Sequence, residues 1–145
     1  MSDRFVLDAS VVIAWSLGEP ETFDRALLVL EAMKTAKALV PAIWQAEVAN
    51  ALVVKERQKR IDEAFLRKLL KHVQELPVEV DLVAARETFD RVLPLARRHQ
   101  LSVYDATYLE LCVRERVPLA SFDEALLAAA SREDIATTFG AQPHE

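Results

Sequence analysis

Four acidic residues stand where water does not normally reach a side chain: Asp8, Glu47, Asp105 and Asp123. Asp8 follows the apolar run at residues 5–7, and Asp123 follows the run at 119–122, so each comes directly after a predicted strand. The carboxyl ends of parallel strands form the edge of an α/β sheet where ligands bind. Burying an ionised carboxylate costs several kcal/mol in practice, so each such group needs a cation, hydrogen-bond donors or a proton.

The other two acids lie on predicted helical faces that are mainly apolar. Asp105 shares its face with Tyr108 and Cys112, and Glu47 shares its face with Val54. Both carboxylates are therefore expected to point toward the interior.

Three of the four acids also have a local interpretation, because acids are common at helix starts. Asp8 or Ser10, and Asp123, could act as N-caps, and residues 102–105 have the spacing of a capping box. Taken singly, a cap is the more common explanation for these three, and Glu47 is evenly balanced between a structural and a functional role. Glu124 directly follows Asp123, which leaves open which of the two would face a metal.

Considered together, the four acids favour a metal site. Four carboxylates converging on one sheet edge would repel one another unless a multivalent cation lay between them. Oxygen ligands select Mg²⁺ or Mn²⁺. Such ions polarise phosphoryl oxygens and activate bound water, so phosphodiester hydrolysis is the chemistry that this site favours.

Hydrophobic patterning predicts the elements that position these acids. Strands are expected at 4–7, 38–40, 78–80, 118–122 and, weakly, 135–139. Helices are expected at 10–17, 21–36, 42–58, 62–76, 83–98, 102–116 and 123–131, with the helix at 83–98 kinked or shifted near Pro94. Short strands alternating with longer helices predict an α/β fold with a parallel sheet, in which 42–58 and 62–76 form an antiparallel helical hairpin.

The composition is that of one globular domain, expected over 1–140 with a loose tail at 141–145. The chain has 145 residues, of which 52% are hydrophobic and 28% charged. The single cysteine, Cys112, excludes an intramolecular disulfide and a multi-cysteine zinc site. No secretion signal is evident, and no apolar run approaches the roughly 18 residues of a membrane span. We therefore expect a cytoplasmic protein without a membrane partner.

Basic residues gather on the predicted hairpin, although the whole chain has a formal net charge of -5. That total disfavours general attraction to nucleic acid, so any such role depends on local clustering. A solvated face and an RNA-binding face explain the cluster equally well. Its members are Lys55, Arg57, Lys59, Arg60, Arg67, Lys68, Lys71 and His72.

Four segments of the chain resemble the PIN-domain ribonucleases, and most closely the VapC-type toxins of toxin–antitoxin pairs. VLDASVVIAW, AEVANAL, LSVYDATYLELC and LASFDEAL occur in the order and at the intervals typical of that family, across nearly the whole chain. The resemblance implies a three-layer fold with a parallel sheet of about five strands flanked by helices. It also implies a metal-dependent, RNA-cleaving site.

The resemblance extends to individual residues. Asp8, Glu47 and Asp105 correspond to the three principal metal-site acids, and Asp123 to a more variable fourth. Ser10 and Asn50 correspond to small polar residues that support the site. The resemblance also favours RNA binding by Lys55, Arg57, Lys59 and Arg60, a homodimer, and inhibition by a cognate antitoxin.

The hypothesis with most support is a Mg²⁺- or Mn²⁺-dependent endoribonuclease that acts as the toxin of a type II toxin–antitoxin pair. One alternative is a Mg²⁺-binding phospho-acceptor signalling domain, which requires paired acids after the first strand and a lysine after a late strand, and the sequence has neither. Another is a catalytically inactive RNA-binding module. Metal-dependent cleavage of RNA would distinguish the three.

Overall fold

A parallel sheet of four strands forms the centre of the protein, in a computed structural model that describes residues 3–137. The strands are β1 (Arg4–Leu7), β2 (Lys37–Pro41), β3 (Val78–Asp81) and β4 (Leu119–Ala120). Their order is β3-β2-β1-β4, and every neighbouring pair is parallel. The predicted α/β fold with a parallel sheet is therefore confirmed.

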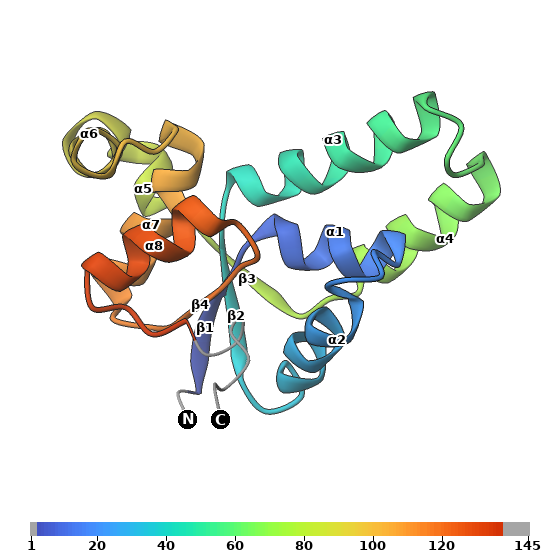
Figure 1. Ribbon diagram of the computed structural model, residues 1–145, viewed down its shortest axis with the longest axis horizontal. Coiled ribbons are helices and arrows are strands. Elements are labelled where there is room, and N and C mark those ends of the chain that lie inside the picture. Colours follow the sequence, from blue (N-terminus) through green and yellow to red (C-terminus); the bar gives the residue numbers. More distant parts are fainter. Residues whose placement is uncertain (1–2, 138–145) are drawn as a thin grey trace.

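Helices cover both faces of this sheet, which makes a three-layer fold (Figure 1). One side carries α1 (Ala9–Leu17), α2 (Phe23–Ala32), α3 (Ile43–Arg57) and α4 (Glu63–Gln74), and the other carries α5 (Val83–Arg86), α6 (Leu93–His99), α7 (Val103–Glu115) and α8 (Glu124–Arg132). A strand covered on both faces has no polar side, and Phe5, Val6 and Leu7 accordingly have no exposed area. Within residues 3–137, no helix is both long and apolar enough to cross a membrane.

The hairpin of α3 and α4 extends away from the sheet, as Figure 1 shows. Between the two helices, Lys59 adopts a left-handed conformation with φ 58. Asp62 then caps α4, because its carboxylate accepts a hydrogen bond from the Phe65 backbone N–H at 2.8 Å. The two predicted helices and their antiparallel arrangement are thus present.

The single helix expected at 83–98 is wrong, because this segment is divided into three parts. A π-helix at Thr88–Val92 separates α5 from α6. Pro94 has no backbone N–H and so cannot make the usual bond to the carbonyl four residues earlier. The Thr88 hydroxyl also donates to the carbonyl oxygen of Ala84 at 2.9 Å, a competing contact. The break therefore lies before the proline, which stands in the first turn of α6.

Within residues 3–137 the sheet has four strands, where about five were expected. Residues 135–137 form no strand, although the Leu119 N–H donates to the Ala136 carbonyl at 2.8 Å. The strand expected at 118–122 is also shorter, because after Ala120 the N–H groups of Phe122 and Asp123 bind serine hydroxyls instead of a neighbouring strand. The remainder of the expected last strand, 138–139, and the expected tail at 141–145 lie outside the described residues.

Candidate active site

Asp8 and Asp123 each follow a strand at the carboxyl edge of the sheet. At this point the order in which strands are added to the sheet changes from one side of β1 to the other. Leu7 pairs with Ala120, and the Asp8 N–H donates to the Ala120 carbonyl at 3.0 Å. From β1 the chain passes to β2 on one side, and much later it adds β4 on the other. Open α/β sheets bind ligands in the crevice outside such a reversal.

Asp8 is a buried carboxylate held by two hydroxyl groups. The residue is only 5% exposed, and the hydroxyls of Ser10 and Ser121 each donate a hydrogen bond to its Oδ2 atom at 2.7 Å. Burial raises the pKa of Asp8 and the charge of Asp123 raises it further, whereas the two serine bonds lower it. Asp8 makes no side-chain cap of α1, so a helix cap does not explain its position.

The two serines are themselves fixed by the backbone that follows β4. The Phe122 N–H donates to the Ser10 hydroxyl at 3.1 Å, and the Asp123 N–H donates to the Ser121 hydroxyl at 3.0 Å. Each hydroxyl therefore accepts one hydrogen bond from a backbone N–H and donates one to Asp8. Ser10, which the resemblance assigns a supporting role, thus contacts Asp8 directly.

Glu47 approaches the same edge from the first half of α3. Its side chain is half-buried, and its Oε1 atom accepts a 2.7 Å hydrogen bond from the hydroxyl of Tyr108 on α7. Burial raises the pKa of Glu47, and the charges of Asp8 and Asp105 raise it further, whereas the Tyr108 bond lowers it. The expected inward orientation of Glu47 is only partial.

Asp105 lies in the first turn of α7 and is half-buried. Ser102 caps this helix, because its hydroxyl accepts a hydrogen bond from the Asp105 N–H at 3.0 Å. The carboxylate of Asp105 is therefore not needed as the cap. Burial raises the pKa of Asp105, and the charges of Asp123 and Asp8 raise it further.

Asp123 does cap a helix, so the local interpretation is correct for this residue. One oxygen of its carboxylate, Oδ1, accepts a hydrogen bond from the Leu126 N–H at 2.8 Å at the start of α8. The same carboxylate raises the pKa of both Asp8 and Asp105. The adjacent Glu124 is exposed and has no such influence on these two pKa values. Asp123 is therefore the acid of this pair that interacts with the others.

The four carboxylates lie close enough together for their charges to affect one another's pKa values. No positive charge is among the influences on the pKa values of Asp8, Glu47 and Asp105. Within residues 3–137, however, no three His, Cys, Asp or Glu side chains are grouped closely enough to hold a metal ion as they stand. The arrangement offers hard oxygen donors and unbalanced negative charge, which suit a divalent cation, but it is not a formed coordination sphere.

The remaining predicted residues lie farther along α3 and in the hairpin turn. Asn50 is exposed, and in the part of the chain that the structure describes its side chain makes no hydrogen bond. Lys55 is half-buried, whereas Arg57, Lys59 and Arg60 are exposed. None of these four cations forms an ion pair within residues 3–137. They are available to phosphate groups, and Arg57 lies about 15 Å beyond Glu47 along the helix axis.

Two hydroxyl residues of this edge, Ser121 and Tyr108, were not predicted from the sequence. Ser121 has no exposed area, and neither has Tyr108. Tyr108 stands one helical turn after Asp105, and Ser121 stands two residues before Asp123. A polar hydroxyl in an otherwise apolar stretch beside each acid was the available signal, but its partner lies far away in the chain.

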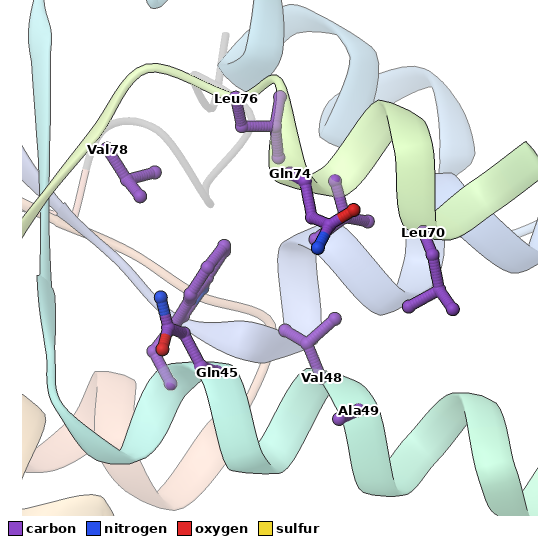
Figure 2. A pocket seen from close by; sticks show the side chains of 9 residues that line it. Gln45, Val48, Ala49, Leu70, Gln74, Leu76 and Val78 are labelled. Atoms are coloured by element: carbon purple, nitrogen blue, oxygen red, sulfur yellow. The ribbon is translucent and has the colours of Figure 1, made fainter. Parts of the chain in front are cut away.

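A separate groove between α3 and α4 contains none of the four acids (Figure 2). It has a volume of about 500 Å³ and is lined by apolar side chains and amides, among them Val48, Leu70, Leu76, Gln45 and Gln74. No lining residue is titratable. The groove therefore offers no side chain for acid–base or metal chemistry.

Comparisons with known proteins show which family and fold the chain resembles. The model of the family described as PIN domain matches residues 5–132. Among solved structures, "Crystal structure of PAE2754 from Pyrobaculum aerophilum" is similar, with a TM-score of 0.59 and 25% sequence identity, and the alignment covers 95% of this chain and 81% of that chain. A search of curated proteins gives no match.

Proposed function

Because the chain belongs to the PIN-domain family, we propose that it is a metal-dependent endoribonuclease whose catalytic acids are Asp8, Glu47, Asp105 and Asp123. Domains of this family are generally metal-dependent nucleases. The observation that carries the proposal is the electrostatic coupling of the four acids. Burial and mutual repulsion raise the pKa values of Asp8, Glu47 and Asp105, and no cation among residues 3–137 offsets these shifts.

Mg²⁺ or Mn²⁺ is the cofactor that fits this donor set. All four side chains offer carboxylate oxygens, which these hard cations prefer, and Cys112 is buried with a raised thiol pKa. Asp8, Glu47, Asp105 and Asp123 would hold the ion. When bound, the ion would polarise the scissile phosphate and lower the pKa of an attacking water molecule.

The residues around the acids orient them for this role. Ser10 and Ser121 both donate to one oxygen of the Asp8 carboxylate, and the bond from the Leu126 N–H fixes Asp123. Because these bonds are already made in the folded protein, the carboxylates need little rearrangement during catalysis.

RNA is the proposed substrate, and the hairpin is its proposed binding surface. A polyanion is repelled by four carboxylates, so the chain must supply attraction elsewhere. Lys55 and Arg57 on the helix that carries Glu47, and Lys59 and Arg60 in the turn that follows it, form no ion pair within residues 3–137 and would provide this attraction. Asn50 lies between them and the acids and is proposed to support the site.

We further propose that the protein is the toxin of a type II toxin–antitoxin pair, that it forms a homodimer, and that a cognate antitoxin inhibits it. The support is the resemblance of its four sequence segments to VapC-type toxins. A small upstream reading frame with a DNA-binding segment, whose product binds this protein and inhibits cleavage, would support the pairing. A partner that binds without inhibiting cleavage would contradict it.

Cleavage of a labelled single-stranded RNA tests the enzymatic proposal. The purified protein is incubated with Mg²⁺, with Mn²⁺ or with EDTA, beside the Asp8→Asn variant. We expect internal cleavage with metal, and none in EDTA or with the variant. RNA binding without cleavage under every condition would favour an inactive RNA-binding module. Phosphorylation by a small phosphodonor without cleavage would favour a signalling domain.

A further inference from the structure

Tyr108 connects the acid of α3 with the helix that carries Asp105. Its hydroxyl donates the 2.7 Å hydrogen bond to Oε1 of Glu47, although the two residues are 61 positions apart. Among the described residues, Tyr108 is the one side chain that donates a hydrogen bond to Glu47. The orientation of the Glu47 carboxylate therefore depends on a residue of another helix.

The tyrosine ring is held rigidly, whereas a glutamate is flexible. Tyr108 has no exposed area, so its packing fixes the position of the hydroxyl. Glu47 is half-buried and has three rotatable side-chain bonds, so without a partner it would sample several rotamers.

The surroundings of Tyr108 keep it a hydrogen-bond donor. Burial raises the pKa of Tyr108, and the charges of Asp8 and Glu47 raise it further, whereas the Ala9 backbone N–H lowers it. The phenol therefore keeps its proton at neutral pH.

We propose that Tyr108 is a positioning residue that holds the Glu47 carboxylate in place for the divalent metal ion. This inference rests on the proposed metal-dependent nuclease function. Tyr108 acts through its hydrogen bond to Glu47 and touches neither the RNA nor the reacting atoms. Outer partners of metal ligands typically contribute about 10- to 100-fold to metal affinity or activity.

Mn²⁺ titration of Tyr108→Phe tests the role of the hydroxyl, because phenylalanine keeps the ring and removes only that group. The matched control is Tyr104→Phe, which removes an exposed hydroxyl from the same helix. We expect the Kd for Mn²⁺ to rise at least about tenfold in Tyr108→Phe and to stay unchanged in Tyr104→Phe. We also expect RNA cleavage by Tyr108→Phe to recover when Mn²⁺ is raised above its new Kd.

A double-mutant cycle identifies the residue through which Tyr108 acts. Glu47→Gln keeps an oxygen that can accept the Tyr108 bond but weakens metal binding, so adding Tyr108→Phe to it should have little further effect on the Mn²⁺ midpoint. A full tenfold additional loss in the double variant would overturn the inference. Unchanged Mn²⁺ binding by Tyr108→Phe would also overturn it, whereas a wild-type protein that binds no Mn²⁺ would overturn the proposed function itself.

A measurement on the unsubstituted site covers the case in which Tyr108→Phe does not fold. The chain has 2 tyrosines, so the protein labelled with 3-fluorotyrosine gives two ¹⁹F signals, which Tyr104→Phe assigns. We expect Mg²⁺ to shift the Tyr108 signal in the wild-type protein and to leave it unmoved in Glu47→Gln. A Tyr108 signal that does not respond to saturating Mg²⁺ in the wild type contradicts the inference.

Discussion

Ser121 donates a 2.7 Å hydrogen bond to Asp8 across 113 positions of the chain. The contact follows from the pairing of β1 with β4, which brings the ends of these strands into register at Leu7 and Ala120. Ser10 donates to the same oxygen of Asp8. The orientation of the most buried acid of the site is therefore determined jointly by both strands.

Removing either serine hydroxyl should weaken metal binding and cleavage. Ser121→Ala and Ser10→Ala each take one donor from Asp8 and leave one backbone N–H without its acceptor. We expect a loss of about 10-fold or more in Mn²⁺ affinity, measured by titration, with a native circular dichroism spectrum. Ser131→Ala, at an exposed position on α8, is the control. Full affinity in both site variants would show that these bonds do not orient a ligand.

Neutralising Asp8 or Asp105 should abolish cleavage while the fold is preserved. Loss of one electrostatic catalytic group costs about 10² to 10³-fold in rate, or roughly 3 to 4 kcal/mol. The measurement is the cleavage rate of a labelled RNA by Asp8→Asn and Asp105→Asn, with circular dichroism to verify folding. Asp24→Asn, at an exposed position on α2, should retain the full rate. If both site variants cleave at nearly the wild-type rate, the assignment of these acids is wrong.

Asp105→Asn should stabilise the metal-free protein at neutral pH. The folded state raises the pKa of Asp105 above its unfolded value of about 3.9, so the unfolded state loses its proton first as pH rises. The free energy of unfolding therefore falls through that window and stays lower above it. Thermal unfolding in EDTA should show a higher Tm for the variant at pH 7 and no difference well below pH 4.

The same pair of proteins should respond differently to metal. Wild type should gain about 2.7 kcal/mol at Mn²⁺ a hundredfold above Kd, or roughly 5 to 10 °C in Tm, and Asp105→Asn much less. Ser102→Ala removes the actual cap of α7 and should cost about 1 kcal/mol with or without metal. A variant that is less stable than wild type in EDTA and gains equally from Mn²⁺ would contradict the role of Asp105.

Reversing the charges of Lys55, Arg57 and Lys59 should weaken RNA binding and its dependence on salt. Each lost phosphate contact should reduce the slope of log K against log salt by about 0.7 for a single strand. Binding is measured by fluorescence anisotropy with Asp8→Asn as the parent, so that the RNA stays intact. Lys34→Glu, beside the opposite edge of the sheet, should leave the slope unchanged. Equal affinity and slope in the triple variant would mean that the hairpin does not contact RNA.

The fold could be predicted where a local pattern coincides with a complete element. The apolar run before Asp8 predicts β1 at residues 4–7, as observed, because a strand covered on both faces has no polar positions to interrupt it. The segment around Pro94 could not be predicted as well. The helical spacing of apolar residues continues across 83–98. The missing N–H of Pro94 and the hydrogen bond of the Thr88 hydroxyl nevertheless divide this segment, and the spacing of apolar residues reveals neither effect.

Some residues of the candidate site could likewise be placed from the sequence, and others could not. Asp8 and Asp123 were placed at the sheet edge by their position after apolar strands, and the sequence also anticipated that Asp123 caps a helix. The bond from Tyr108 to Glu47 joins α7 to α3, and no spacing along the chain indicates it. Contacts that depend on how distant helices pack therefore need the structure.

The position of β1 between β2 and β4 has a consequence during translation. The ribosome delivers β1, β2 and β3 before β4, so the β4 side of β1 has no partner strand until the end of the domain has been made. At that stage Asp8 lacks Ser121, and Asp123 has not been synthesised. On the proposed function, we therefore expect the nascent chain to lack a complete set of site acids, and so to be unable to cleave RNA, until its last strand joins the sheet.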